Sequence, residues 1–255
     1  MTTLFFIHGM WAASWVWEPF SRVFEEKGFC CIRPTLRHHV DGPATPDRGL
    51  GTTSLLDYAA DLQREIRALP DPPVVIGHSM GGLLAQILAA RGLARAAVLL
   101  TPASPRGIVA LRPSVMRAFA SIMCRPGVWK RPMRPTFNEA SYGIFNMVPG
   151  EQRRALFDRF CFESGRAAAE IGFSWLDPAR TAAVDARAVT CPMLVIGAQH
   201  DRMTPAPIVQ KIARCYPTAT YRLLPGFGHW LIGEPGFGEV AAHILEWLRE
   251  HESKP

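Results

Sequence analysis

Short apolar runs alternate along the chain with longer segments in which apolar residues recur every three or four positions. Runs of this kind are typical of strands buried in a parallel sheet, and the longer segments are typical of amphipathic helices. The runs predict strands near residues 3–7, 29–33, 73–77, 95–100, 193–198 and 219–224. The longer segments predict helices near residues 15–27, 54–69, 80–91, 204–215 and 237–251. Since strand and helix alternate, we expect an α/β fold with a mainly parallel sheet of about six strands and helices on both faces.

One stretch departs from this alternation. Between residues 104 and 183 no strand pattern is evident, and proline, arginine, methionine and aromatic residues crowd between short helical pieces. Such a stretch is expected to form a helical cap inserted over the carboxyl edge of the sheet. The predicted domain organisation is therefore an α/β core, residues 1–103 and 184–255, with a cap insertion of residues 104–183.

The cap is expected to supply one wall of a substrate pocket. Many of its apolar side chains are candidates for that wall, although most of them fit the packed interior of the cap as well. The predicted pocket residues are Trp11 from the core and Phe119, Met123, Phe145 and Trp175 from the cap. Further apolar candidates in the cap are Met116, Trp129, Phe137 and Met147.

The segment Gly77-His78-Ser79-Met80-Gly81 joins a predicted strand to a predicted helix that is apolar on nearly every face. A serine at the tip of so sharp a turn takes a strained backbone conformation. The residues two positions before and after it must be small so that strand and helix can pass closely. The G-x-S-x-G pattern alone is a weak signal, but this context gives it a mechanical meaning. Ser79 is therefore predicted to be a nucleophile.

A nucleophilic serine needs a general base and a group that orients the base. Asp201 follows the predicted strand at 193–198, and His229 follows the strand at 219–224 on a glycine-rich loop. The order serine, acid, histidine is the one in which folds with such a strand-to-helix turn supply their catalytic partners. We therefore predict Asp201 as the acid and His229 as the base. The alternatives are a helix cap for Asp201 and an ordinary loop residue for His229.

An oxyanion hole would complete this machinery. The strand at 3–7 ends in His8-Gly9-Met10, which turns away from the sheet. The backbone N–H groups of Met10 and Met80 are the predicted donors to a substrate oxygen that becomes negatively charged in the transition state. Loss of one such donor typically costs about 2.7–4 kcal/mol of barrier.

Together these motifs resemble the α/β-hydrolase family over nearly the whole chain. The matching segments are His8-Gly9 with Trp11, the turn around Ser79, Gly197 to Asp201, and Gly228-His229-Trp230. The resemblance implies the family's fold, a catalytic triad and no cofactor or metal. It is poorly specific for substrate. Because the chain opens directly in the strand that carries His8-Gly9, it looks like the compact members of the family, among them small carboxylesterases and plant-type hydroxynitrile lyases.

The resemblance implies hydrolysis of a small-molecule carboxylic ester with hydrophobic groups, and a polymeric ester is a lesser alternative. Family members with an aspartate or cysteine nucleophile are disfavoured by Ser79. The hydroxynitrile lyases are disfavoured by Gly9, since they carry threonine there. Hydrolysis of a carbon–carbon bond and perhydrolysis use the same triad and stay open. So does a different class, a small-molecule receptor that retains the fold.

Composition fits a single globular domain of 255 residues, with 48% hydrophobic and 20% charged residues. No apolar run approaches the roughly 18 residues of a membrane span. The chain enters a strand pattern at once, so no signal peptide and a cytoplasmic location are expected. The six cysteines show no metal spacing and are expected to be thiols, with a pairing of Cys124 and Cys161 left open. Oligomeric state stays open as well.

The first part of the cap, residues 104–135, carries seven cationic side chains and no acidic one. This local excess is larger than the net charge of +6 of the whole chain. It indicates either attraction to an anionic substrate, polymer or membrane surface, or a solvated exterior, which we favour. A nucleic-acid partner is not expected, because no recognition motif accompanies the charge. The cationic residues are Arg106, Arg112, Arg117, Arg125, Lys130, Arg131 and Arg134.

A second polar cluster lies in the loop between residues 34 and 52. It contains His38, His39, Asp41 and Asp47, residue types that bind metals. Their irregular spacing and the proline- and glycine-rich context favour a polar loop over a metal site.

Overall fold

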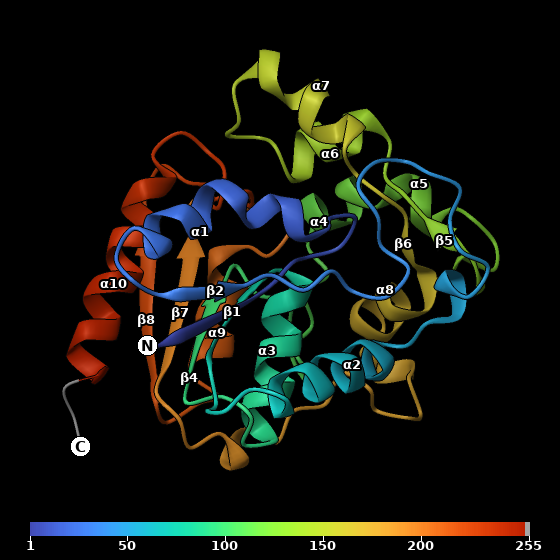
Figure 1. The fold of residues 1–255 in the computed structure, drawn as a ribbon. Helices are drawn as coiled ribbons and strands as arrows, with labels where there is room; N and C mark the ends of the chain where they lie inside the picture. The colour runs from blue at the N-terminus through green and yellow to red at the C-terminus, as the bar shows by residue number, and fades with distance from the viewer. Residues whose placement is uncertain (253–255) are drawn as a thin grey trace.

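The computed structural model of the protein describes residues 1–252, and its centre is a six-stranded parallel sheet (Figure 1). The strand order is β2-β1-β3-β4-β7-β8, so the chain reverses direction across the sheet between β1 and β3. Each predicted strand is found within one residue of its predicted bounds. The strands are β1 (Thr3–Ile7), β2 (Cys30–Ile32), β3 (Val74–His78), β4 (Ala96–Leu100), β7 (Met193–Ala198) and β8 (Ala219–Leu224).

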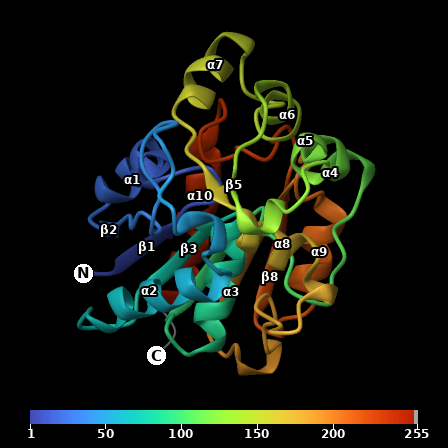
Figure 2. The same cartoon turned by 90° about the vertical axis from the view of Figure 1, so that its right-hand side faces the viewer.

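Helices cover both faces of the sheet, as expected for strands that are buried on two sides (Figure 2). Side chains of β1 alternate between the faces. Leu4 and Phe6 join the core with α1 and α10, whereas Phe5 and Ile7 join the core with α2, α3 and α9. These helices are α1 (Glu18–Glu25), α2 (Leu55–Arg67), α3 (Met80–Ala90), α9 (Ala206–Ala213) and α10 (Phe237–Glu252). The predicted α/β fold class is confirmed.

The chain between β4 and β7 contains the stretch that departs from the alternation, here called the inserted segment (residues 104–183). Figure 1 shows its helices α4 to α7 beyond the end of the sheet toward which the arrow of β7 points. Its strands β5 and β6 form a two-residue antiparallel ladder that the sequence pattern did not predict. Its elements are α4 (Pro113–Ala118), α5 (Ala120–Met123), β5 (Pro132–Met133), α6 (Phe137–Gly143), α7 (Gly150–Asp158), β6 (Glu163–Ser164) and α8 (Gly165–Gly172).

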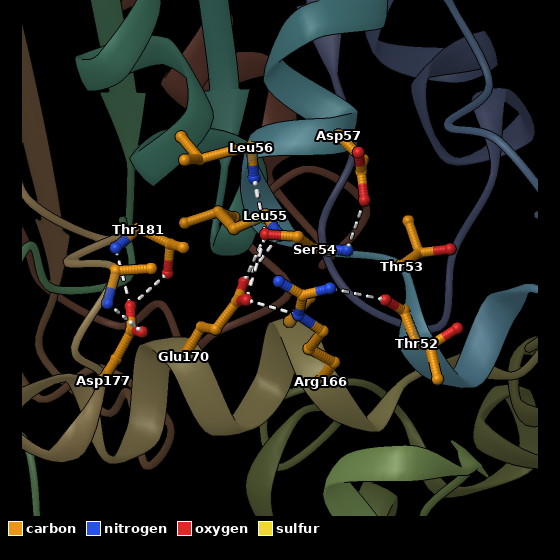
Figure 3. Close-up of polar contacts among 12 residues, drawn as sticks. Thr52, Thr53, Ser54, Leu55, Leu56, Asp57, Arg166, Glu170, Asp177 and Thr181 are labelled. Atoms are coloured by element: carbon orange, nitrogen blue, oxygen red, sulfur yellow. Dashed lines mark hydrogen bonds and ion pairs between the residues drawn. The ribbon is translucent and has the colours of Figure 1, made fainter.

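A buried carboxylate fastens α8 of the inserted segment to the first turn of α2 (Figure 3). Glu170 accepts hydrogen bonds from the Ser54 hydroxyl at 2.9 Å, from the Leu55 N–H at 2.7 Å and from Arg166 at 2.9 Å. Ser54 is also the N-cap of α2 and forms a capping box with Asp57. An anion at a helix N-terminus is stabilised by the unpaired N–H groups there. These hydrogen bonds fasten this end of the inserted segment to the core.

A second buried carboxylate, Glu163, ties the inserted segment to the loop that was considered as a metal site. It accepts hydrogen bonds from His39 Nε2 at 3.0 Å and from the Tyr58 hydroxyl at 2.8 Å. Burial opposes the charged form of His39, but the facing carboxylate outweighs burial, so the pKa of His39 is raised. Within residues 1–252, no group of three or more His, Cys, Asp or Glu side chains is placed to hold a metal ion. His39 is a structural ion-pair partner.

Candidate active site

Ser79, Asp201 and His229 come from three different strand ends. Ser79 follows β3 and is the N-cap of α3, Asp201 follows β7, and His229 follows β8. Because the strands are parallel, their carboxyl ends lie at one edge of the sheet, where ligands bind in open α/β folds. The loops after β7 and β8 reach across β4 to the turn after β3.

The turn around Ser79 has the strained geometry that its sequence predicts. Ser79 has φ of 54° and ψ of −119°, outside the regions that L-residues usually occupy. A side chain on Gly77 would overlap the carbonyl of Gly81, and one on Gly81 would overlap the carbonyl of Ile7. The two glycines therefore allow strand and helix to pass closely, and the turn lifts Ser79 Oγ away from the sheet.

Gly77→Ala is expected to destabilise the protein by at least about 3 kcal/mol, because the added methyl group overlaps backbone that cannot move without shifting α3. The measurement is the free energy of unfolding in urea. Gly238→Ala is the matched control, since a methyl group there meets no atom within 4 Å and lies in a helix. A Gly77→Ala variant as stable as this control would contradict the described packing.

The three side chains form a hydrogen-bonded chain. His229 Nε2 lies 3.0 Å from Ser79 Oγ, and His229 Nδ1 lies 2.9 Å from Asp201 Oδ2. The other carboxylate oxygen of Asp201 accepts the N–H groups of Met203 at 2.7 Å and Thr204 at 2.8 Å. Burial favours the neutral acid, but His229 and these hydrogen bonds outweigh it and lower the pKa of Asp201. Asp201 is therefore a carboxylate that holds the proton of His229 on Nδ1 and leaves Nε2 free to accept one.

The predicted oxyanion donors, Met10 and Met80, line the cavity that opens above Ser79, described below. Neither the Met10 N–H nor the Met80 N–H donates a hydrogen bond to another residue in the described part of the chain. His8 braces the turn before Met10, because its Nδ1–H donates to the Gly9 carbonyl at 2.8 Å and its Nε2 accepts from the Leu36 N–H at 3.1 Å. Burial lowers the pKa of His8 to about 3, which keeps it neutral and able to accept that bond.

The sequence is similar to that of a known protein family over most of its length. Residues 4–242 match the model of the alpha/beta hydrolase family. The chain belongs to the α/β-hydrolase family. The match runs from Leu4 in β1 to α10 and includes Ser79, Asp201 and His229, and the fold is that of an α/β hydrolase.

Solved structures of other α/β hydrolases superpose on nearly the whole protein at low sequence identity. A pyrethroid hydrolase from Sphingobium faniae is 18% identical with a TM-score of 0.72, and the match covers 96% of each chain. A Paleococcus ferrophilus monoacylglycerol lipase is 19% identical with a TM-score of 0.71, covering 98% of this chain and 94% of the other. An Arabidopsis methylesterase is 13% identical with a TM-score of 0.72, covering 98% and 99%.

In this α/β hydrolase the loop that carries His229 is held from two sides. His78 Nε2–H donates to the His229 carbonyl at 2.8 Å, and burial lowers the pKa of His78 to about 3. Glu234 accepts the N–H groups of Gly228 at 2.7 Å and Trp230 at 3.1 Å, the two neighbours of His229. Sequence reasoning missed Glu234. A lone acidic residue five positions after the histidine, in an apolar loop, was the available signal.

Glu234 gives a pH-dependent prediction. Burial raises the pKa of its carboxyl from 4.5 to about 7 although two N–H groups oppose the shift. The ionised form is thus disfavoured in the folded protein, so the stability from this group is present below about pH 4.5 and lost as the pH rises through about 7. The loss corresponds to about 3 kcal/mol. The amide in the Glu234→Gln variant does not titrate. The difference in unfolding free energy, wild type minus variant, should therefore fall by about that amount between pH 4.5 and about pH 8. A pH-independent difference in urea unfolding would contradict this.

A largely apolar cavity of about 290 Å³ opens over Ser79 between the core and the inserted segment. Of the predicted pocket residues, Trp11, Phe119, Met123 and Trp175 lie on its wall. Phe145 was predicted to line the pocket but is not among its lining residues. Its ring packs behind the wall against Phe160 and Trp230, which do line the cavity, with ring centres 5.1 and 5.2 Å away. Among the further candidates, Met116 and Trp129 line the cavity, whereas Phe137 and Met147 are not among its lining residues.

Two further expectations from the sequence concern the state of the cysteines and the crossing of a membrane. All six cysteines are free thiols, so Cys124 and Cys161 are not paired. Cys161 is buried, and burial raises the pKa of its thiol to about 12. In the part of the chain that the structure describes, no helix combines the length and apolarity that crossing a bilayer requires.

Proposed function

We propose that the protein is a serine hydrolase that cleaves carboxylic esters with hydrophobic groups. The observation that carries this proposal is the chain of hydrogen bonds from Ser79 through His229 to Asp201 at the base of an apolar cavity. The triad is recognised by such geometry and roles rather than by sequence position. Esterases and a lipase among the similar structures support the same reaction class.

In the proposed reaction, His229 Nε2 takes the proton of Ser79 Oγ as this oxygen attacks the ester carbonyl carbon. Asp201 holds the imidazole in the required tautomer and stabilises the imidazolium. The N–H groups of Met10 and Met80 stabilise the negative charge on the carbonyl oxygen. His229 then gives its proton to the departing alcohol, and the acyl group stays on Ser79. A water molecule, deprotonated by His229, releases the acid in the second half of the cycle.

The inserted segment is proposed to act as a cap that shields this chemistry from bulk water and selects hydrophobic substrates. Most of the cavity wall opposite Ser79 comes from it, through residues such as Phe119, Met123 and Trp175. Removing water strengthens the electrostatic interactions inside a site. We propose a cytoplasmic location, which the six free thiols support.

The proposal is tested with p-nitrophenyl esters of increasing acyl length, from acetate to palmitate. Each buried methylene contributes about 0.8 kcal/mol, so kcat/KM should rise about tenfold from acetate to butyrate if the apolar wall receives the acyl chain. The length at which the rise stops measures the pocket. Folded protein that turns over none of these esters would contradict the proposal. A carbon–carbon hydrolase or a receptor that binds ligand without rapid turnover would then be favoured.

A further inference from the structure

The cavity mouth is surrounded by exposed apolar side chains. Twelve large apolar residues are exposed in residues 1–252, and six of them line the cavity above Ser79. Trp129, for example, is 53% exposed, and Leu176, next to the lining residue Trp175, is 71% exposed. Single exposed apolar residues are common on protein surfaces, but a group of them around one opening indicates an interaction surface. The six lining residues are Val109, Leu111, Met116, Met123, Trp129 and Trp175.

These side chains come from neighbouring pieces of the inserted segment. Met116 lies on α4 and Met123 on α5, which lie side by side in Figures 1 and 2. Trp129 lies in the turn after α5, and Trp175 in the turn after α8. Each of them is both exposed and part of the cavity wall, so together they mark the place where the cavity meets solvent.

Cationic residues stand among these residues. Arg125 lines the cavity, Arg112 follows the lining residue Leu111, and Lys130 follows the lining residue Trp129. Three of the seven in residues 104–135 are engaged within the protein. Arg106 donates to the Asp177 carbonyl at 2.8 Å, Arg117 lies 4.0 Å from the ring centre of Tyr142, and Arg134 lies 4.2 Å from that of Phe157. Within the described residues, the remaining four side chains make no hydrogen bond, ion pair or ring contact. These unpaired side chains are Arg112, Arg125, Lys130 and Arg131.

Two acidic residues of the inserted segment, Glu139 and Asp177, accept hydrogen bonds from neutral groups. Glu139 accepts hydrogen bonds from the Ser121 N–H and hydroxyl, both at 2.6 Å, and from Thr136. Asp177 accepts the N–H and hydroxyl of Thr181 at 2.6 and 2.7 Å (Figure 3). Neither carboxylate pairs with the four unpaired cations, so their charge stays available to a partner.

We propose that the exposed apolar residues and the four unpaired cations around the cavity mouth form a docking surface for an anionic lipid interface. We call them the mouth surface. Cations near a negatively charged leaflet are attracted to its headgroups, while aromatic and aliphatic side chains insert at the headgroup boundary. Charge alone would suit any polyanion, but the apolar residues interspersed with it favour a surface that also has an apolar interior. Docking here places the open cavity against the lipid.

This docking carries a consequence for catalysis that rests on the proposed ester hydrolysis. An ester with a long acyl chain leaves the interface through the mouth surface and enters the cavity without crossing bulk water. Docking itself does not require that reaction. The two proposals can therefore fail separately, and the test below measures binding without turnover.

The test is flotation of the protein with vesicles of phosphatidylcholine, with and without phosphatidylglycerol, at low and high salt. The Ser79→Ala background prevents any hydrolysis of the lipid. Binding is expected only with phosphatidylglycerol, and it should weaken at high salt. The double variant Arg112→Glu/Lys130→Glu should bind at least about tenfold more weakly.

Lys27→Glu/Arg95→Glu is the matched control, because it changes the net charge equally at the opposite edge of the sheet. Both residues are exposed and lie just before strands β2 and β4. This control should bind like the parent, and thermal unfolding midpoints confirm that each variant folds. Leu176→Ser removes apolar area without removing charge and should weaken binding about threefold or more.

Three results would overturn the proposal. The first is absence of binding to vesicles that contain phosphatidylglycerol. The second is equal loss of binding in the double variant and in its control. The third is binding that is insensitive to Leu176→Ser and equally strong to heparin, which would identify a general polyanion site instead of a lipid surface.

Discussion

Ser79→Ala is expected to lower the rate of ester hydrolysis at least about a thousandfold while the protein keeps its fold. The hydroxyl group is the proposed attacking atom, and no other side-chain nucleophile lies within hydrogen-bond distance of His229 Nε2 among the described residues. Alanine removes only this oxygen and leaves the backbone turn and its flanking glycines in place. Residual activity would come from the oxyanion donors and substrate binding alone.

Ser104→Ala is the matched control for that variant. Ser104 lies on the wall of the same cavity, and its buried hydroxyl has no hydrogen-bond partner in the described structure. Its loss should change kcat/KM by less than about threefold, since no interaction with His229 is removed. The measurement is p-nitrophenol release from butyrate ester by both variants and the wild type. Near-normal activity of Ser79→Ala would rule out Ser79 as the nucleophile.

Asp201→Asn is expected to lower kcat about ten-thousandfold, with little change in KM. The oxygen of the new amide would stay on the N–H groups of Met203 and Thr204, which need an acceptor. The amide nitrogen, a donor, would then face His229 Nδ1. His229 Nδ1 would then have to accept a hydrogen bond, so the imidazole proton would move to Nε2. Nε2 is the atom that must take the proton from Ser79.

Asp177→Asn separates that effect from a general loss of loop structure. Asp177 also accepts two backbone N–H groups, those of Ala179 and Thr181, but it does not contact His229. This variant should hydrolyse esters at nearly the wild-type rate. Comparable losses in Asp201→Asn and Asp177→Asn would show that the aspartate acts on stability and not on the histidine tautomer.

The sequence was sufficient for the features that local patterns encode. Most strands of the sheet are apolar runs, although β8 contains Arg222. Ser79 stands directly after its strand, and Asp201 and His229 lie in the loops that follow theirs, so their positions at strand ends could be predicted. The two glycines around Ser79 could be predicted as well, because a close crossing of strand and helix requires them. Helix ends differ more from the prediction than strand ends do. The predicted helix at 204–215 is the shorter α9 (Ala206–Ala213), which begins after Pro205.

The buried carboxylates could not be predicted, since their partners come from distant parts of the chain. Glu163, Glu170 and Glu234 look like ordinary surface residues in sequence, yet each accepts several hydrogen bonds in the interior. Phe145 failed for the opposite reason. An apolar residue in a helical insertion suits either a packed interior or a cavity wall, and only the neighbouring rings decide between them.

The pairing of the cationic side chains in the inserted segment could not be predicted either. Its seven cationic residues are evident in the sequence, but the distinction between paired and unpaired side chains depends on the fold. Three are engaged by carbonyl groups or rings of the protein, and within residues 1–252 the side chains of the other four make no hydrogen bond, ion pair or ring contact. The solvated exterior that we favour from sequence stays a prediction, and the proposed docking surface is the alternative that the vesicle experiment tests.

The most direct test of the central claim is covalent labelling with a fluorophosphonate, which reacts with an activated serine and stays attached. Intact mass should show one adduct for each chain, and peptide mapping should place it on Ser79. Asp201→Asn should react much more slowly, because its histidine no longer accepts the serine proton. Unlabelled Ser79, or an adduct at another residue in protein that still hydrolyses esters, would contradict the assignment of the nucleophile.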